Sequence, residues 1–591
     1  MKNIFATLGL VCVLTVIGST GLMAQWTSDP SKNTPVDTGG HSAADLTMLK
    51  DGSGGAFAVW DDLRAADGVP KIFAQHFDKT GHALWTSNGL EVCPGGADQT
   101  FPQAAVVGDG GIIVSWFEAN RDSVFGSPVS AVFAQRITPG GTLRWGSAGL
   151  PIAAPNYGQE FYPGNVNTAI AQDGEGGAYI AWALLDAGVQ YLMVSRIDSS
   201  GNIHWSQSAV NSLTLLTDGV LIGGFEQIRL LQNGTTGVIA AWRDVRNAFS
   251  TGVALFAQKF DSAGSILWDS AGVALSPGPS SLQDQENVQI VSDGAGGAIY
   301  AWEQSYSGGY PKAYAGHINT SGNLAWISAS DSVGVLVDST GGQKSLSMTS
   351  EGSGTTIITW SDGANIVYAQ KIASDGSRPW GASPAAIAAN GSGEVLAPDG
   401  NGGVIMAWAQ GLQNGVNIFA QHVNSSGQPV WSNPTYGTTG NPVSTTPSTF
   451  QEKPVIVSDD AGGAIVAWYD LRASGYGGPF DLYAQHIGSN GNVTNVSNQN
   501  SGLPTNFSLS QNYPNPFNPA TVISYQLPTA SRVTLKVFDM LGRQIATLVN
   551  GQMEAGMHQV SFDASRLASG VYIYQLQAGS FVASKKLVLL K

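Results

Sequence analysis

Sixteen tryptophans recur along the 591 residues in a fixed order, and this order constrains the fold more than any other feature. One set ends a glycine-led apolar run and consists of Trp60, Trp116, Trp182, Trp242, Trp302, Trp360, Trp408 and Trp468. A second set follows the first seven of these by 20 to 29 residues: Trp85, Trp145, Trp205, Trp268, Trp326, Trp380 and Trp431. Trp26 is the sixteenth. Self-similarity of this kind indicates stacked supersecondary units.

Each repeated unit is predicted to contain four short β-strands. In the second unit the strands are expected at 103–107, 111–116 and 131–137, with a fourth that starts at 143–145 and ends near 150–152. These runs are rich in β-branched and aromatic residues and are bounded by Gly, Asp, Asn and Ser. Units of 48 to 66 residues, repeated eight times, predict an all-β fold: an eight-bladed β-propeller.

The eighth unit lacks its second tryptophan, because Asn495 stands in that place. Trp26 lies 34 residues before Trp60, within the 28 to 37 residues that separate a second tryptophan from the next first one elsewhere. We therefore expect residues 26–36 to form the outer strand of the last blade, beside 483–487. Such a join leaves no unpaired edge in the ring.

Composition limits the class of partner. Glycine accounts for 75 residues, charged residues for only 12%, and the formal net charge is −15, which argues against nucleic acid as a partner. There are two cysteines, and Cys12 lies in the predicted export signal, so Cys93 has no partner for a disulfide in the mature chain. We predict no cofactor and no metal site.

Residues 1–24 are predicted to be a signal peptide, with Lys2 before an apolar run and a small-residue cleavage site at 22–24. A membrane anchor is a weaker reading because polar and glycine residues interrupt the run, and no later stretch is apolar enough to span a bilayer. A lipoprotein is disfavoured because Val11 precedes Cys12. The propeller is expected over 25–495 and a polar linker over 496–506.

Two kinds of turn recur between the strands. Glycine-rich turns begin with an aspartate, as at Asp51, Asp173, Asp293 and Asp399, and we favour turn hydrogen bonding over calcium binding because the alternating carboxylates of a calcium loop are absent. The stretches 78–85, 198–205 and 261–268 resemble the Asp-box turn of sialidase-type propellers, with an extra residue before Gly and before Trp. That resemblance implies blade packing and not hydrolysis.

A cationic type of residue follows the Ala-Gln pair of the third strand in six units, and Arg196 and His317 hold the place in two looser units. The position is occupied by His76, Arg136, Arg196, Lys259, His317, Lys371, His422 and His486. An anionic ligand or a metal is one reading. We favour pairing with acidic neighbours, such as the aspartate two places after the first tryptophan (Asp62), because every blade has the residue. Arg64 is expected to pair locally with Asp62.

Residues 507–591 break the repeat and contain no tryptophan. They open on Phe507 and a run of prolines to Pro519, continue through 521–528 and 537–543, and end on Lys585 and the residues after it. This segment resembles the C-terminal sorting domain of the type IX secretion system, the variety also similar to the Ig-like domain of flagellar hook-capping proteins. The resemblance implies a small β-sandwich, export across a bacterial outer membrane, and the secretion machinery as partner. Its motif residues are Tyr513, Pro514, Asn515, Pro516, Phe517, Asn518, Pro519, Gly542, Arg543, Gly570, Tyr572, Lys585 and Lys586.

Function is expected on the face of the disc where connection lengths vary, at 117–130, 153–164, 218–226 and 432–452. Candidate ligand-binding residues there are Glu118, Arg121, Tyr157, Glu160, Phe161, Tyr162 and Phe225. We predict a secreted, surface-displayed binding or adhesion module for a glycan or a protein. The alternatives are a glycan hydrolase or lyase and a purely structural surface component. We identify no catalytic residues, because no nucleophile motif, metal-ligand spacing or phosphate loop is present.

Overall fold

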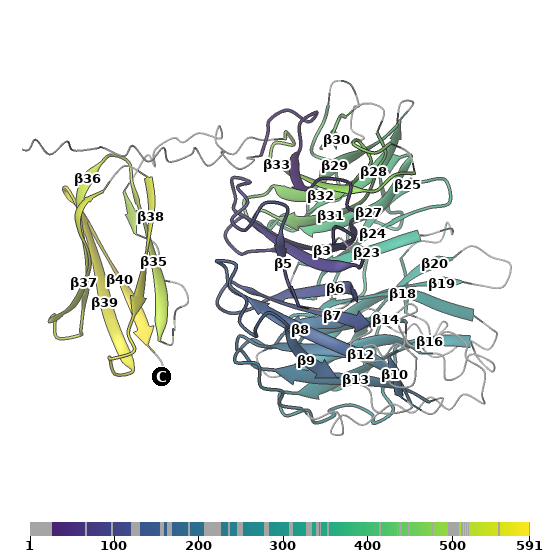
Figure 1. Ribbon diagram of the computed structural model, residues 1–591, viewed down its shortest axis with the longest axis horizontal. Helices are drawn as coiled ribbons and strands as arrows, with labels where there is room; N and C mark the ends of the chain where they lie inside the picture. The colour runs from purple at the N-terminus through teal and green to yellow at the C-terminus, as the bar shows by residue number, and fades with distance from the viewer. Residues whose placement is uncertain are drawn as a thin grey trace, which may run out of the picture. The chain divides into compact units, whose positions relative to one another are not determined.

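The computed structural model describes residues 26–65, 68–95, 98–119, 131–153, 159–161, 168–186, 189–205, 226–234, 237–244, 252–276, 283–305, 311–326, 334–337, 342, 344–351, 354–412, 415–433, 435, 440–446, 449–475, 477–493, 507–509, 512, 515, 517, 519–553 and 556–589. Over these residues the fold is all-β, as predicted, with no helix assigned (Figure 1). The described residues therefore contain no helix that is long and apolar enough to cross a membrane. The predicted signal peptide at 1–24 and the linker at 496–506 lie outside the described residues. The chain divides into two compact units, Met1–Val496 and Ser497–Lys591.

The N-terminal unit is propeller-like, because small antiparallel sheets follow one another around a closed circuit. The strands that open the sheets are β2 (Ala44–Lys50), β6 (Asp98–Val106), β11 (Ala169–Gln172), β14 (Glu226–Gln232), β18 (Gln283–Ser292), β23 (Lys344–Ser350), β27 (Gly391–Pro398) and β31 (Gln451–Ser458). Each of them contacts the next in this order, and β31 contacts β2.

The second strands carry the first set of tryptophans. They are β3 (Ala56–Asp62), β7 (Ile112–Ala119), β12 (Ala178–Asp186), β15 (Gly237–Asp244), β19 (Ala298–Ser305), β24 (Thr356–Ser361), β28 (Val404–Leu412) and β32 (Ala464–Asp470). Most of their residues up to the tryptophan are apolar and buried, because both of their faces are covered by neighbouring sheets. All eight tryptophans of this set are at most 1% exposed.

The third strands pair antiparallel with the second. They are β4 (Lys71–Phe77), β8 (Ala131–Ile137), β13 (Val189–Ile197), β16 (Gly252–Asp261), β20 (Lys312–Ile318), β25 (Ile366–Ile372), β29 (Gly415–Val423) and β33 (Asp481–Ile487). The prediction for 131–137 is met residue for residue.

The remaining strands of this unit are short. They are β1 (Thr34–Asp37), β5 (Leu90–Glu91), β9 (Leu150–Ala153), β10 (Gln159–Phe161), β17 (Val273–Ala274), β21 (Leu324–Ala325), β22 (Val335–Leu336), β26 (Ala385–Ala389) and β30 (Asn441–Pro442). The fourth strand expected to start at 143–145 is reduced there to one bridge, Ile137 with Leu143, before β9. A short parallel pairing of Gly252 with Gln283 merges the sheets of the fourth and fifth units.

The two ends of the repeat meet in one sheet. β1 pairs antiparallel with β33, with Thr34 opposite Ala484 and Pro35 opposite Tyr483. Trp26 is fully buried, its indole nitrogen donates to the carbonyl of Lys79 at 3.0 Å, and its ring packs on Gly81. A Cβ on Gly81, whose φ is +86°, would lie 2.6 Å from that ring, so the close approach requires glycine.

The same contact, an indole N–H that donates to a carbonyl of the next unit, recurs along the chain. Indole nitrogens of the second set donate to a carbonyl in the three–four turn of the following unit: Trp85 to Pro139, Trp205 to Ser262, Trp268 to Thr320, Trp326 to Ser374, Trp380 to Ser425 and Trp431 to Ser489. These turns are the Asp-box-like stretches, so they do serve packing between units. Trp26 makes the equivalent contact between the eighth unit and the first.

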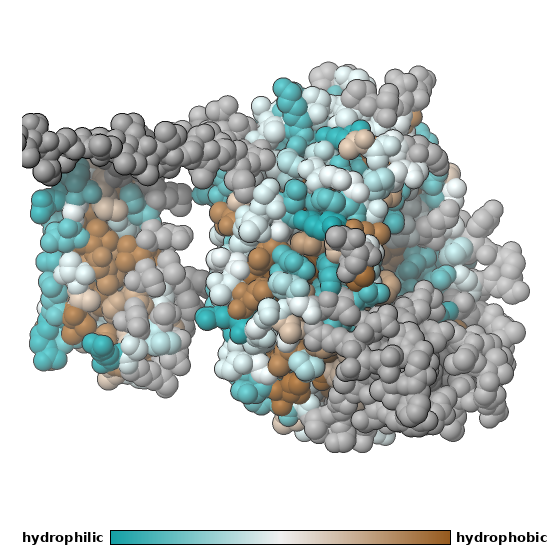
Figure 2. Space-filling view, viewed as in Figure 1, coloured by the Kyte–Doolittle hydropathy of each residue, from teal (hydrophilic) through white to brown (hydrophobic). Residues whose placement is uncertain are grey.

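The C-terminal unit has two sheets that enclose one apolar core. One contains β34 (Ser508–Leu509), β35 (Ala520–Leu527) and β38 (Gly556–Asp563); the other contains β37 (Gln544–Met553), β36 (Ser531–Phe538), β39 (Gly570–Ala578) and β40 (Phe581–Leu589). Val533, Leu535 and Val537 of β36 are fully buried and alternate with less buried residues, as one face of a half-buried strand should. Its surface has apolar areas (Figure 2), and its exposed apolar side chains are Met540, Leu541, Ile545, Val571 and Val582.

Candidate functional site

A pocket of about 300 Å³ opens where the sheets of the sixth, seventh and eighth units meet. It is lined by Asn365, Asn390, Ser392, Ala409, Gly411, Val416, Phe450, Gln451 and Glu452. These residues come from the two–three turns, from the four–one connections and from the strand ends beside them. The pocket therefore lies on the face that carries the variable connections, opposite the glycine-rich turns.

The pocket combines one aromatic ring with several polar side chains. Phe450 is half-buried, as are Val416 and Glu452, whereas Asn365 and Asn390 are exposed. Both asparagines have a φ of +59°, a conformation that asparagine tolerates better than most residues. Backbone hydrogen bonds link the two turns, because Gly391 N donates to Asn365 O at 2.9 Å.

Gln451 fixes the rear wall of the pocket. Its Oε1 accepts a hydrogen bond from Ile418 N at 3.1 Å, and its Nε2 donates to Ser444 Oγ and to Asp470 Oδ2, both at 2.8 Å. Because the side chain is fully buried and bonded at both ends, the wall keeps its shape without a ligand.

The opening exists because the connection between the sixth and seventh units is very short. β26 ends at Ala389 and β27 begins at Gly391, so Asn390 alone joins the two strands. A one-residue connection cannot cover the space between neighbouring sheets. The predicted connection 432–452 supplies Phe450, Gln451 and Glu452 of the lining, but none of them was named as a candidate. The wall at Asn365 and Asn390 was not predicted, although the short spacing between Trp360 and Trp408 was visible in the sequence.

The predicted loop residues are only partly described. Arg121, Tyr157, Tyr162 and Phe225 lie outside the described residues, and of Glu160 and Phe161 only the backbone in β10 is described. Their role stays a prediction.

Glu118, which completes the predicted set, is 1% exposed, and its Oε2 accepts a hydrogen bond from the Trp116 indole at 3.3 Å. Asp62 accepts from Trp60 in the same way at 2.9 Å. Glu118 thus accepts a hydrogen bond within its own strand, and its role in ligand binding stays a prediction.

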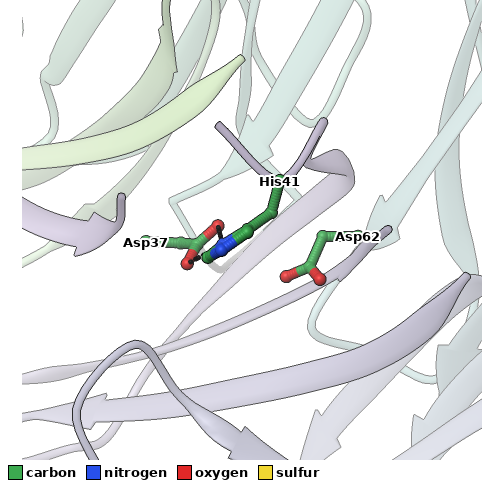
Figure 3. Close-up of side chains that lie close together, drawn as sticks. All are labelled: Asp37, His41 and Asp62. Carbon is green, nitrogen blue, oxygen red and sulfur yellow. Dashed lines mark hydrogen bonds and ion pairs between the residues drawn. The ribbon is translucent and has the colours of Figure 1, made fainter. Parts of the chain in front are cut away.

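Asp37, His41 and Asp62 form a cluster near the N-terminal strand (Figure 3). His41 Nδ1 lies 3.1 Å from Asp37 Oδ1, and both carboxylates are also bonded to Arg64, whose Nη2 lies 2.9 Å from Asp37 and 2.5 Å from Asp62. Burial raises the pKa of Asp37, and Arg64 opposes that rise. Because Arg64 already pairs with both carboxylates, the cluster fits an ion-pair network better than a metal centre. The predicted local pair of Arg64 with Asp62 is confirmed.

The cationic position of the third strand pairs with an acid, as predicted, but with a different one. The partner is the first residue of the one–two turn and not the aspartate two places after the tryptophan. The pairs are His76–Asp51, Arg136–Asp109, Arg196–Asp173, His317–Asp293, Lys371–Glu351, His422–Asp399 and His486–Asp459. Antiparallel pairing places these two positions at one end of the sheet, whereas Asp62 lies at the other end. Lys259 instead donates to Gly296 O and Thr320 Oγ1.

The glycine-rich turns use the hydrogen bonds expected of them. Asp51 Oδ1 accepts from Ser53 N at 2.7 Å and from Gly55 N at 2.8 Å. Burial works to raise the pKa of Asp51, but hydrogen bonds from His76, Ser53 and Gly55 outweigh it and lower the pKa to about 2. The carboxylate is thereby committed to the turn and to the third strand.

Two buried carboxyl groups depart from this pattern. Glu394 is 2% exposed with neither oxygen in a hydrogen bond among the described residues, and burial raises its pKa to about 8. Asp61 is 6% exposed, and burial together with the charge of Asp45 raises its pKa to about 7. Glu394 lies two residues after Ser392, which lines the pocket. The residues that match Glu394 in the first and sixth units are the apolar Leu46 and Leu346.

The sorting-motif residues are partly described. Tyr513, Pro514, Pro516 and Asn518 lie outside the described residues. Asn515 and Phe517 attach the lead-in to β40: Asn515 Oδ1 accepts from Val588 N at 2.8 Å, and Phe517 N donates to Val588 O at 2.9 Å. Gly542 has a φ of +76° in the hairpin turn, where Arg543 Nε donates to Asp539 at 2.7 Å. The other described members of the motif are Pro519, Gly570, Tyr572, Lys585 and Lys586.

Comparison with known families identifies the C-terminal part of the chain. Residues 511–590 match the family described as the secretion system C-terminal sorting domain. This confirms the resemblance to the type IX sorting domain. The chain therefore carries a sorting domain for secretion across an outer membrane, to the cell surface or the extracellular space. No curated protein sequence matches the chain.

Solved structures resemble the chain only at low identity. A protein of unknown function from Dyadobacter fermentans is 12% identical, over 66% of this chain and 94% of that one, with a TM-score of 0.31. PorZ of Porphyromonas gingivalis, a bacterial surface component of the type IX secretion system, is 13% identical over 95% of this chain and 82% of that one, with a TM-score of 0.28. An α-L-arabinanase of Penicillium chrysogenum is 12% identical over 65% of this chain and 92% of that one, with a TM-score of 0.32. At these scores the similarities carry no inference about function.

Proposed function

We propose that the chain is a secreted surface protein whose N-terminal unit binds a glycan in the pocket lined by Phe450 and Glu452. The N-terminal unit is an eight-bladed β-propeller, closed by the strand that follows the signal peptide. The C-terminal unit is an Ig-like sandwich that directs export through the type IX machinery and leaves the propeller displayed or released outside the cell.

The composition of the pocket carries this proposal. A half-buried aromatic ring offers a face on which the apolar side of a sugar ring can stack. Amide, hydroxyl and carboxylate groups around it, on Asn365, Asn390, Ser392 and Glu452, suit the hydroxyls of a sugar. The lining includes no lysine or arginine, so the described groups favour a neutral saccharide over an anionic one.

A glycan-active enzyme is the second candidate, and two carboxyl groups favour it. Glycoside hydrolysis needs one carboxyl that is protonated and one that is ionised. Glu452 lines the pocket, and Glu394, with a pKa raised to about 8 by burial, is protonated at neutral pH close to its wall. Glu394 is 2% exposed, so catalysis would require the wall to move. Binding without reaction needs no such movement and is preferred.

A single experiment separates the two candidates. Residues 25–506 are incubated with a panel of plant, algal and microbial polysaccharides, and retention is measured together with the release of reducing ends from the same samples. Retention without release supports binding, and release supports the enzyme. If neither occurs for any saccharide, the proposed function is wrong.

A further inference from the structure

In two units the residue after the first tryptophan stabilises the start of the next sheet. Tyr469 Oη accepts a hydrogen bond from Leu46 N at 2.6 Å, and Glu303 Oε1 accepts from Leu346 N at 3.1 Å. The donor in each case follows a residue in the left-handed region, Asp45 at φ +48° or Ser345 at +57°, within a β-bulge of the opening strand. The bulge turns the N–H out of its own ladder, and the neighbouring unit supplies the acceptor.

Asp61 occupies this position in the first unit but has no N–H to accept from. It faces the sheet of the second unit, as its strand neighbours Phe57 and Val59 do by alternation. There the bulge consists of Phe101, at φ +56°, and then Pro102, which carries no backbone N–H. Accordingly Asp61 Oδ1 is buried with no hydrogen-bond partner among the described residues, and the side chain is 94% buried.

A second carboxylate lies beside Asp61. Asp45 belongs to the bulge of β2, next to Ala44, which pairs with Asp61 across the two strands. Asp45 is half-buried, and its charge raises the pKa of Asp61. Both carboxylates therefore face the junction between the first and second units.

The surrounding cations compensate this pair only in part. Arg64 is bonded to Asp37 and Asp62, and Asp62 lies on the face of β3 that carries Trp60. Lys453 acts on Asp45, but its side chain is 75% exposed and lies 3.7 Å from Glu452. Asp62, Glu452 and the Tyr469 phenol are the other ionisable groups nearby, and none of them brings positive charge.

We propose that Asp45 and Asp61 bind a calcium-class divalent cation at the junction of β2, β3 and β6. Both donors are hard carboxylate oxygens, which suit calcium, and waters complete the coordination. The cation takes the place of the backbone N–H that Pro102 lacks as a partner for Asp61, and it links the first two units of the ring. With two carboxylates the expected dissociation constant is on the order of 10⁻⁴ to 10⁻³ M, the range typical of extracellular calcium modules.

The test measures thermal unfolding of the mature chain, followed by tryptophan fluorescence at pH 8. The protein is treated with a chelator and then titrated with CaCl₂ to about 10 mM, and binding is measured in parallel by calorimetry. We expect calcium to raise the melting temperature by about 2 °C, the shift for a ligand at roughly ten times its dissociation constant. Asp61→Asn should abolish the shift and the calorimetric signal, and should unfold at a higher temperature than wild type in chelator.

Two further variants make the result specific. Pro102→Ala restores an N–H opposite Asp61 and should reduce the calcium response at least twofold while keeping both carboxylates. His41→Ala alters the Asp37 cluster instead and should leave the calcium response unchanged. The proposal is overturned if wild type binds no calcium up to 10 mM, or if Asp61→Asn keeps the full response. The proposal does not depend on the glycan pocket.

Discussion

Trp26 joins the two ends of the repeat, and its removal is the most informative perturbation of the fold. The side chain is fully buried, donates one hydrogen bond to Lys79 O at 3.0 Å and packs on Gly81. Replacement of a buried tryptophan by alanine costs about 3 to 5 kcal/mol, of which about 1 kcal/mol is the hydrogen bond. We therefore expect Trp26→Ala to lower the free energy of unfolding of residues 25–506 by that amount.

The matched control is Trp380→Ala. Trp380 makes the same contact inside the chain, from the sixth unit to Ser425 O of the seventh at 2.8 Å, and it is only half-buried. Chemical denaturation should show a loss of about 1 to 3 kcal/mol for this variant, because the half-buried Trp380 buries less apolar surface in the folded state than Trp26 does. A Trp26→Ala loss no larger than the Trp380→Ala loss would refute the reasoning that the N-terminal segment closes the ring.

Three other predictions concern pH and export. Asp51→Asn should lower stability at pH 7 by about 2 kcal/mol, the value of a folded pKa near 2 against an ordinary 3.8; because a depressed pKa stabilises only above the unfolded value, the difference from wild type should vanish between pH 4 and 2. Glu394→Leu should stabilise the protein at pH 7 by up to about 3 kcal/mol, because the pKa raised to about 8 makes wild type lose stability as pH rises from 4.5 to 8; a melting series that is parallel for both proteins over this range contradicts the burial argument. Truncation after Thr505 should leave the propeller folded by circular dichroism but retained in the periplasm of a type IX-competent host, and continued surface display would contradict the sorting role.

The sequence predicted the elements that every unit repeats. Trp60 and its equivalents, the turn at Asp51 and the apolar second strands recur, so repetition itself averages out local ambiguity. The pairing of β1 with β33 followed from counting tryptophans, because a missing member of a periodic set marks where the chain ends meet.

The details that depend on register were not accessible in the same way. The acid that pairs with His76 was assigned to Asp62 instead of Asp51, because spacing along the chain does not say which end of an antiparallel pair two residues share. The predicted connection 432–452 contains Phe450 and Glu452, but the opposite wall of the pocket arises from a short connection at Asn390, which carries no compositional signal. The orphaned Asp61 depends on a proline in another unit, which no local pattern reveals.

The pocket is the central claim about function, and affinity measured face by face tests it most directly. Isothermal titration of residues 25–506 with the best saccharide from the polysaccharide panel should give a tenfold or greater loss of affinity for Phe450→Ala and for Glu452→Gln, since each removes about 1.4 kcal/mol or more. Ser53→Ala, on the exposed glycine-rich turn of the opposite face, should bind as wild type does. Unchanged affinity in both pocket variants, with a loss in the Ser53 variant, would contradict the account.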